Sequence, residues 1–392
     1  MATRVAVVVS HPIQHFCPQY ESWARLKGIE LNVYFASRHG LDVYHDASFG
    51  TSIKWEGLTL DFAHEFLEGA KGRAVDRNID SYEIEGRLST WRPDLVVVYG
   101  YGQPLQRRVT AWAARNRRPV AMIGDSVLRG QRPWLKRVPK RLWLGRHLRN
   151  VDVFLTVGDA NESYYRHFGI SDRQFVRMCF PIDRDRFDQT LKDREIVRGR
   201  LRADLGIPPD NKIVLMVGKC LQSKRQHDLI LFSNQLRAER NDVTVILAGS
   251  GPDAARLKAD ARRIGPGGVI FAGFVNLNEL VDYYVAADVY AHCAAVEAHS
   301  LAISEAIYCG LPIVISDQCG SYGPTDDVRP GLNGLVYPCG SADGLSRSLL
   351  RLIDDGELRC NMGRESEAIG KANQILAHGK ALAQAVCLLG ST

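Results

Sequence analysis

Short apolar runs recur along the whole chain, and this recurrence restricts the fold more than any other feature of the sequence. Turn residues bound the runs, and segments of helical pattern separate them. Continuous apolar runs that alternate with helices are typical of a parallel sheet covered by helices on both faces. The runs lie at 4–10, 30–37, 94–100, 119–126 and 152–158, and again at 212–218, 243–251, 269–275, 288–294 and 311–317. The sequence therefore predicts an α/β protein built on parallel strands.

This pattern stops and then restarts, which indicates two domains. A chain of 392 residues is too long for a single core, and a charged segment separates the two halves. We predict a doubly wound, Rossmann-like domain over residues 1–182 and a second one over 183–370, facing a central cleft. A C-terminal helix over 371–392 is expected to cross back to the first domain. In such sheets ligands bind beyond the carboxyl ends of the strands.

The composition is that of a soluble globular protein, with 45% apolar and 24% charged residues. No apolar run approaches the roughly 18–20 residues that span a bilayer, and the run at 5–9 is too short for a signal peptide. We therefore expect a cytoplasmic protein.

The nine cysteines form no CxxC pair and match no zinc spacing. They are interpreted as reduced core residues, and no metal is expected.

Charge is distributed unevenly around a net value of +6. Residues 39–85 carry ten acidic and four basic residues, whereas residues 129–149 carry eight basic residues and no acidic one. The acidic stretch either lines the cleft, where it would favour a cationic partner, or is a solvated loop. The basic segment 133–149 includes two tryptophans, so it either docks on an anionic membrane surface or is a solvated segment. Nucleic acid is disfavoured because the chain has no helix-turn-helix or aromatic RNA-binding signature.

Two lysines follow the strand predicted at 212–218. Gly218 allows the chain to turn, and Lys219 and Lys224 then lie on a loop that leads into a helix. Cations carried to a helix N-terminus suit a phosphate or diphosphate, although loop lysines are often simply solvated. Gly249 opens a second tight turn, Gly249-Ser250-Gly251-Pro252, at the end of the run 243–251.

Two glutamates flank the start of another predicted helix. Ser300 is a candidate N-cap for a helix that runs to about Cys309, where Gly310 ends it. Backbone N–H groups of residues 300–302 would then be offered to an anion. Glu297 lies in the turn before this helix and Glu305 lies within it, so the two carboxylates suit hydroxyls at both ends of an elongated diphosphate ligand. A pair of ordinary surface glutamates is the alternative.

Taken together, these motifs resemble the family-4 retaining glycosyltransferases of GT-B fold. The motifs are Glu297-x7-Glu305, the Lys219 and Lys224 loop, GSGP from Gly249, FAGFV at 271–275, ELVDYYVAADVY and EAIYCGLPIVISD. The resemblance is dense over residues 212–355. The first half resembles the family more loosely, through SHPIQHF, WRPDLVVVYGY and TVGDANESYY.

The resemblance implies a role for each matching residue in binding a nucleotide-sugar donor, with UDP as the favoured nucleotide. It places Lys219 and Lys224 on the donor diphosphate, Phe274 and Val275 beside the base, Glu305 on the ribose and Glu297 on the donor sugar. It also implies transfer with retention of anomeric configuration and without a metal or other cofactor. Where the family commonly has Gly-Phe-Gly before a leucine, this chain has Ala298, His299 and Ser300 before Leu301. That departure leaves the donor sugar undefined, because this turn shapes its pocket.

In the N-terminal domain, two polar groups follow predicted strands and are candidates for the acceptor side. His11 follows the first strand, with His15 four residues later, and Asp125 lies at the end of the strand Pro119–Ile123. Each is either a site residue or an ordinary structural residue. His11 and Asp125 complete the predicted catalytic set of Glu297, Lys219 and Lys224.

The chain also resembles, within the family, the kanosaminyl and xylosyl transferases of 2-deoxystreptamine aminoglycoside biosynthesis. This narrower resemblance implies a UDP-sugar donor and a small cationic aminocyclitol acceptor such as paromamine. The alternative enzyme is membrane-associated and acts on a lipid-linked glycan. A nucleotide-sugar-binding protein without transfer activity is a third hypothesis, disfavoured by the retained lysines and glutamates. Whether the protein forms a homodimer is left open.

Overall fold

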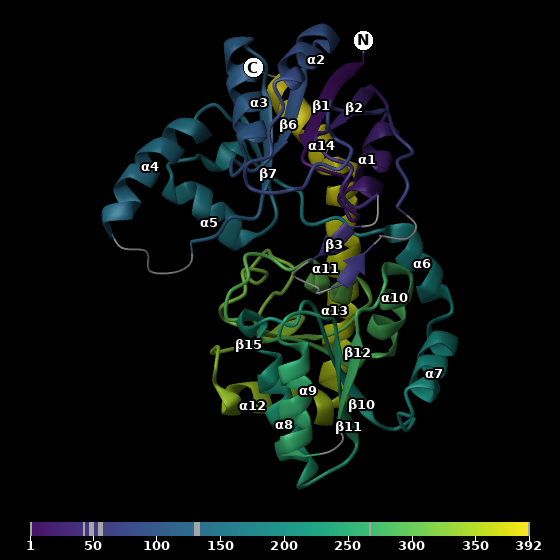
Figure 1. The fold of residues 1–392 in the computed structure, drawn as a ribbon. Coiled ribbons are helices and arrows are strands. Elements are labelled where there is room, and N and C mark those ends of the chain that lie inside the picture. The colour runs from purple at the N-terminus through teal and green to yellow at the C-terminus, as the bar shows by residue number, and fades with distance from the viewer. Residues whose placement is uncertain are drawn as a thin grey trace. The chain divides into compact units, whose positions relative to one another are not determined.

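The computed structural model describes residues 2–41, 44–46, 51–53, 58–128, 134–265 and 268–390. Within this part of the chain the structure separates into two compact units (Figure 1). Unit 1 comprises residues 1–44, 53–182 and 373–392, and unit 2 comprises residues 45–52 and 183–372. The predicted domains were 1–182, 183–370 and 371–392.

Unit 1 is built on a seven-stranded sheet with the order β5-β2-β1-β6-β7-β8-β9, and its strand pairs are parallel. The strands are β1 Thr3–Val9, β2 Ile29–Phe35, β5 His64–Phe66, β6 Leu95–Tyr99, β7 Val120–Gly124, β8 Val153–Thr156 and β9 Phe175–Arg177. The helices are α1 Cys17–Ala24, α2 Glu83–Trp91, α3 Pro104–Arg115, α4 Trp134–Leu148, α5 Asp159–His167, η1 Asp172–Gln174, the π-helical turn η3 Leu376–Lys380 and α14 Ala381–Gly390. Two short strands, β3 Tyr44–Asp46 and β4 Thr51–Ile53, pair in a separate sheet, and most of their residues are assigned to unit 2.

Unit 2 is built on a six-stranded parallel sheet with the order β12-β11-β10-β13-β14-β15. The strands are β10 Lys212–Val217, β11 Val243–Ala248, β12 Val269–Gly273, β13 Val289–His292, β14 Ile313–Ser316 and β15 Gly334–Tyr337. The helices are α6 Arg184–Lys192, α7 Arg194–Asp204, η2 Gln222–Lys224, α8 Gln226–Arg237, α9 Ala254–Ile264, α10 Leu277–Ala286, α11 Leu301–Tyr308, α12 Ala342–Asp354 and α13 Gly356–Ile375.

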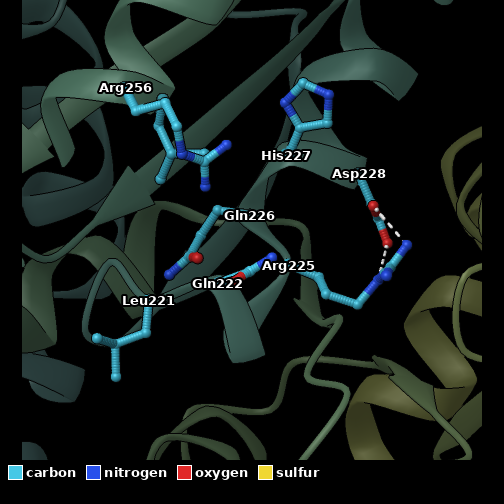
Figure 2. A pocket seen from close by; sticks show the side chains of 8 residues that line it. Leu221, Gln222, Arg225, Gln226, His227, Asp228 and Arg256 are labelled. Atoms are coloured by element: carbon cyan, nitrogen blue, oxygen red, sulfur yellow. Dashed lines mark hydrogen bonds and ion pairs between the residues drawn. The ribbon is translucent and has the colours of Figure 1, made fainter. Parts of the chain in front are cut away.

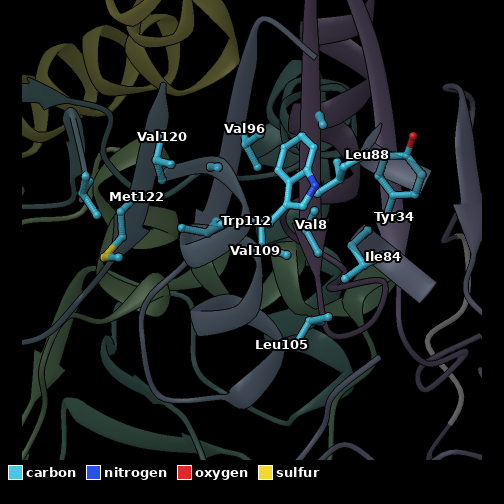
Figure 3. Close-up of a cluster of buried hydrophobic side chains, with 14 of the residues drawn as sticks. Val8, Tyr34, Ile84, Leu88, Val96, Leu105, Val109, Trp112, Val120 and Met122 are labelled. Atoms are coloured by element: carbon cyan, nitrogen blue, oxygen red, sulfur yellow. The ribbon is translucent and has the colours of Figure 1, made fainter. Parts of the chain in front are cut away.

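The apolar runs are continuous because both faces of each sheet are covered. In β1, Val5 and Val7 belong to the core on one face, whereas Ala6 and Val8 belong to the core on the other. Figure 3 shows Val8 in this second core, beside Trp112 of α3 and other apolar side chains from the neighbouring elements. The prediction of two Rossmann-like α/β domains is therefore confirmed.

The C-terminal segment completes the first core of unit 1. Ala381, Leu382 and Ala385 of α14 pack in the same core as Val5 and Val7, and Figure 1 shows the yellow α14 beside the purple β1. The side chains of Gln19 and Trp23 in α1 both donate hydrogen bonds to the carbonyl of Ala377, at 2.7 and 3.0 Å. The last part of the chain is therefore an integral layer of unit 1.

Five strands did not have a recognisable pattern in the sequence: β3, β4, β5, β9 and β15. Each has only three or four residues, and β5, β9 and β15 lie at sheet edges, so their apolar patterns are too short to identify. The interpretation of the cysteines as core residues holds for the six that are buried. It is wrong for Cys339, which is half-buried, and for Cys360 and Cys387, which are exposed on α13 and α14. Among the described helices, none is long and apolar enough to cross a bilayer.

Candidate functional site

The strand order of unit 2 reverses between β10 and β13, and both glutamate and lysine candidates follow these two strands. β10 leads into the loop with Lys219 and Lys224, and β13 leads into the turn with Glu297. Ligands of open parallel sheets bind at such a switch point, beyond the carboxyl ends of the strands. The fold therefore brings together residues that are more than seventy positions apart in the sequence.

The loop after β10 is fixed by close backbone packing. A Cβ atom at Gly249, where φ is +151°, would lie 1.9 Å from the carbonyl oxygen of Gly218, so only glycine fits there. Gln226 at the start of α8 donates its side-chain Nε2–H to the carbonyl of Lys219 at 2.8 Å. Gly249 was predicted to bind the donor. In the structure it lies close against the backbone of Gly218, where the loop after β10 begins.

Lys224 and Glu297 form an ion pair in unit 2. Both side chains are less than one-fifth exposed, so water screens the pair weakly. Burial, with a further contribution from the charge of Lys219, lowers the pKa of Lys224. The adjacent Glu297 carboxylate favours the ammonium form despite that burial.

His292, at the end of β13, extends this pair and was not among the predicted site residues. Its Nε2 atom is 3.3 Å from Glu297 Oε2, and its Nδ1 atom is 3.4 Å from the hydroxyl of Tyr290. Burial, followed by the charge of Lys224, lowers the pKa of His292 to about 3, so the ring is neutral. Because a carboxylate only accepts hydrogen bonds, the proton of this neutral ring must lie on Nε2. The sequence signal was a histidine at the carboxyl end of a predicted strand.

Glu305 lies deeper in the same unit. It is 9% exposed on α11 and accepts a hydrogen bond from the hydroxyl of Tyr284 at 2.7 Å. Burial raises the pKa of Glu305 to about 7, against the opposing effects of Tyr284 and Arg186. The proposed contact of Glu305 with a ribose stays a prediction.

Replacing Glu305 with glutamine is expected to remove a pH dependence of stability. The pKa in the folded state, about 7, exceeds the ordinary 4.5, so between these values the folded state holds a proton that the unfolded chain releases. Wild-type stability therefore falls as the pH rises from about 4.5 to about 7, by on the order of 3 kcal/mol, and then levels off. Glutamine still accepts from Tyr284 but does not ionise. Urea unfolding gives the free energy of unfolding of both proteins at about pH 5 and about pH 8. Relative to wild type, the variant should be more stable at the higher pH than at the lower one. An equal difference between variant and wild type at both pH values would contradict this account.

The turn before α11 differs from the sequence expectation in one respect. The helix begins at Leu301 with Ser300 at the N-cap position, but the Ser300 side chain makes no capping hydrogen bond. The Ser300 backbone N–H instead donates to Ser321 Oγ at 2.8 Å. The expectation that this N–H is offered to an anion is therefore wrong, because a loop packed behind the turn already satisfies it.

His299 in this turn is buried beside two aspartates. One nitrogen or oxygen from each of His299, Asp326 and Asp327 lies within 4.8 Å of the others, a spacing that suits a metal ion. This group has no zinc-like spacing in the sequence because the two aspartates follow His299 by about 27 residues. The expectation of a metal-independent protein stays a prediction.

Phe274 and Val275, the predicted base contacts, directly follow β12 and are half-buried.

A small pocket of about 180 Å³ lies at the start of α8, and sequence reasoning did not identify it. Figure 2 shows Arg225 turned toward Asp228, which it binds through two hydrogen bonds of 2.7 and 3.0 Å. The lining residues are Leu221, Gln222, Arg225, Gln226, His227, Asp228, Arg256 and Leu257. The pocket adjoins the lysine loop but includes neither Lys219 nor Lys224.

Unit 1 has a larger pocket, of about 490 Å³, at its own switch point between β1 and β6. Aromatic side chains and one carboxylate characterise it, and the lining residues are His15, Phe16, Tyr99, Gly100, Tyr101, Gly102, Ile123, Gly124, Asp125, Ser126 and Phe180. Asp125 is exposed at this pocket. The structure thus places the predicted Asp125 together with His15.

His11, the other predicted residue of unit 1, does not line this pocket. Its Nδ1 atom is 2.9 Å from Ser10 Oγ, and its ring meets the ring of His39 edge-on at 5.3 Å. Burial, with the neighbouring His39, lowers the pKa of His11 to about 4. Burial and then the charge of His11 lower the pKa of His15 to about 3, so His15 is a neutral group in the pocket wall.

The acidic stretch 39–85 is largely neutralised within unit 1. Arg108 binds Asp80 at 2.7 Å, and Arg115 binds Glu85 at 2.7 Å. Among its described residues none lines the pocket of unit 1. Asp42 and Glu56 lie outside the described residues, as does Pro133 of the basic segment.

The described side chains of α4 present an exposed apolar face within the basic segment. Leu142 is 71% exposed and Trp143 is 49% exposed. The Trp143 ring stacks on the ring of His147, with centroids 5.6 Å apart. This face is unusual because large apolar side chains are rarely this exposed together.

Comparison with known proteins shows a similarity over part of the chain. Residues 197–368 match the family model described as glycosyl transferases group 1. A GDP-mannose-dependent monoacylated alpha-(1-6)-phosphatidylinositol monomannoside mannosyltransferase of Corynebacterium glutamicum is 26% identical over 254 residues, which are 63% of this chain and 62% of that one. A D-inositol 3-phosphate glycosyltransferase of Streptomyces bingchenggensis is 32% identical over 211 residues, covering 50% of this chain and 44% of that one.

Solved structures match over a greater length. Anabaena Alr3699/HepE in complex with UDP has a TM-score of 0.72 at 16% identity, with 100% of both chains covered. WaaG, a glycosyltransferase involved in lipopolysaccharide biosynthesis, has a TM-score of 0.61 at 18% identity, covering 96% of this chain and 100% of that one. The chain spans about three fifths or less of the length of the curated relatives described above. Residues 197–368 are therefore similar to the group 1 glycosyl transferases, within a chain that has two Rossmann-like domains of GT-B fold.

Proposed function

We propose that this protein is a retaining glycosyltransferase that transfers a sugar from a nucleoside diphosphate sugar, with UDP as the nucleotide. The observation that carries the proposal is the Lys224–Glu297 ion pair at the switch point of unit 2, in the segment that matches group 1 glycosyltransferases. A diphosphate can replace the Glu297 carboxylate at the Lys224 ammonium. That exchange releases Glu297 to accept hydrogen bonds from sugar hydroxyls.

The chemistry follows from where charge develops during transfer. As the bond between the anomeric carbon and the diphosphate breaks, negative charge grows on the leaving diphosphate and positive charge grows on the sugar. Lys219 and Lys224 stabilise the first, and the Glu297 carboxylate faces the second. Preorganised charges of this kind are commonly the largest source of rate acceleration in an enzyme. The leaving diphosphate takes the proton of the attacking acceptor hydroxyl, so no strong protein base is required.

For the acceptor, we propose a cationic aminocyclitol pseudodisaccharide, which binds in the pocket of unit 1. The aromatic side chains Phe16, Tyr99 and Tyr101 offer flat surfaces to a sugar ring. The exposed carboxylate of Asp125 offers a partner to an ammonium group. The charge complementarity rests on Asp125 because the described acidic residues of stretch 39–85 lie elsewhere.

A lipid-linked glycan is the second candidate acceptor. The exposed Leu142 and Trp143 on α4, within a basic segment, suit contact with an anionic membrane surface. The names of several relatives also specify lipid or lipopolysaccharide products, including an alpha-monoglucosyldiacylglycerol synthase of Streptococcus pneumoniae that is 31% identical over 116 residues.

Mass spectrometry of a defined reaction distinguishes these proposals. Purified protein is incubated with paromamine and either UDP-glucose or UDP-xylose, without membranes or added metal, and we expect a pseudotrisaccharide mass. UDP binding by calorimetry without product would reject this acceptor or these donors. Product formed only with liposomes that carry a lipid-linked glycan would favour the second candidate. Absence of UDP binding would overturn the proposed function itself.

A further inference from the structure

We propose that Asp327 is a positioning residue that fixes the turn carrying Glu297, and that it thereby sets how tightly the donor sugar is held. This inference rests on the proposed function. The Asp327 carboxylate joins both sides of the turn through one oxygen. Oδ2 lies 3.1 Å from His299 Nε2 in the turn, and it accepts a hydrogen bond from Ser304 Oγ in α11 at 2.7 Å.

Burial makes these contacts strong. Asp327 is 1% exposed and His299 is 5% exposed, so water does not compete for them. The carboxylate can only accept, so His299 Nε2 carries the proton that faces it. Charge-assisted hydrogen bonds in such an environment are shorter and stronger than neutral ones.

The backbone of the same turn is held by the same loop, which connects β14 to β15. The Gly320 N–H donates to the carbonyl of Glu297 at 3.1 Å, and the Ser300 N–H donates to Ser321 Oγ at 2.8 Å. The turn is thus attached to this loop at Glu297, at His299 and at Ser300. Its sequence from Ala298 to Ser300 has no glycine, so the attachments act on a backbone of limited freedom.

Asp327 is itself held in place by its own loop. Its carbonyl accepts from Asn333 Nδ2 at 2.9 Å, and its N–H donates to Asp326 Oδ1 at 2.8 Å. Asn333 is fully buried and accepts the Arg329 N–H at 2.7 Å through Oδ1. The loop therefore forms a fixed base behind the turn, and a change at Asp327 is transmitted to the turn.

The consequence concerns the sugar rather than the nucleotide. Glu297 lies two residues before His299, and its carboxylate is the group proposed to bind the donor sugar. Misplacing a catalytic group by about 1 Å can cost about 10²-fold in rate. The lysines proposed to hold the diphosphate lie on the loop after β10, a different segment from the turn that Asp327 anchors, so we expect UDP binding to depend little on this anchor.

The Asp327→Asn variant tests the inference because asparagine has the same shape but lacks the charge. Calorimetry compares UDP with UDP-glucose and UDP-xylose, and the donor that wild type binds more tightly is used throughout. We expect an unchanged affinity for UDP, loss of the additional affinity that the sugar provides, and a fall in kcat/KM of about 10²-fold.

Asp288→Asn is the matched control for simple destabilisation. Asp288 is also a nearly buried aspartate of unit 2, but it binds Arg198 and Arg202 at 2.7 and 2.9 Å before β13 begins. This variant should lower thermal stability while the sugar's contribution to binding is retained. If Asp327→Asn behaves in the same way as Asp288→Asn, Asp327 is only a structural residue and the inference is overturned.

Two further results have separate meanings. A stoichiometric divalent metal in the purified protein, whose removal reproduces the Asp327→Asn effect, would identify His299, Asp326 and Asp327 as a metal centre and overturn the positioning role. Failure of the proposed function is visible in wild type, which would then bind neither UDP nor a UDP-sugar. That result would reject both proposals, whereas a wild-type-like Asp327→Asn variant rejects only this one.

Discussion

Replacing Glu297 with glutamine is expected to lower the turnover number by about 10²- to 10³-fold while UDP affinity changes little. Glutamine keeps the size of the side chain and still accepts a hydrogen bond from His292, but it removes the negative charge that faces the donor sugar. The charge matters most in the transition state, when positive charge develops on the sugar. Lys224 loses an internal competitor for the diphosphate, so UDP binding is retained or slightly strengthened.

Steady-state kinetics of sugar transfer and calorimetry with UDP measure these two effects separately. Glu239→Gln is the control, because Glu239 is an exposed residue of unit 2 that lies two residues after the end of α8. It should leave both quantities at their wild-type values. Equal losses in turnover and in UDP affinity for Glu297→Gln would show that Glu297 binds the nucleotide or maintains the fold instead.

The Lys224→Met variant is expected to weaken UDP binding by about 10- to 100-fold, because a hydrogen bond to a charged group contributes roughly 1.5–3 kcal/mol. Turnover should fall by a further ~10²-fold or more, since the lysine also stabilises the charge that develops on the leaving diphosphate. Methionine preserves the apolar stem of the side chain. It leaves the largely buried Glu297 without its ion-pair partner, which adds a cost to stability.

Lys258→Met, an exposed change on α9, is the control for loss of one positive charge from unit 2. A cycle with Lys224→Met, Glu297→Gln and the double variant isolates the coupling of the pair. The stability losses should not add, because the first substitution already breaks the ion pair. Additive losses in urea unfolding would contradict a direct interaction between Lys224 and Glu297 in the folded protein.

The sequence was sufficient to predict the fold because each buried strand is a continuous run of apolar residues, which can be recognised locally. A strand covered on both faces needs apolar residues at every position, so the run at 4–10 identifies β1 without knowledge of its neighbours. The short edge strands β5, β9 and β15 have no apolar run long enough to be recognised. The candidate donor site was predictable to the extent that its residues directly follow strands, as Lys219 and Glu297 do.

Contacts between distant segments were not predictable in this way. His292 lies beside Glu297 because strand β13 ends where the turn begins, but the pairing with Lys224 requires β10 and β13 to be neighbours in the sheet. Asp327 reaches His299 through a loop that starts after another strand. In unit 1, the packing of the loop after β1 places His15, and not His11, in the pocket with Asp125.

The sequence by itself determined the two parallel α/β sheets, the approximate strands and helices, and the residues at the carboxyl ends of the strands. These properties depend on which side chains are apolar and on local turn chemistry, and each is encoded within a few neighbouring residues. The tertiary structure alone decided which charged groups meet: Lys224 with Glu297, His299 with Asp327, and the acidic residues Asp80 and Glu85 with arginines of their own unit. Charge interactions depend on distance and burial, and both are set by strand order and packing between segments far apart in the chain.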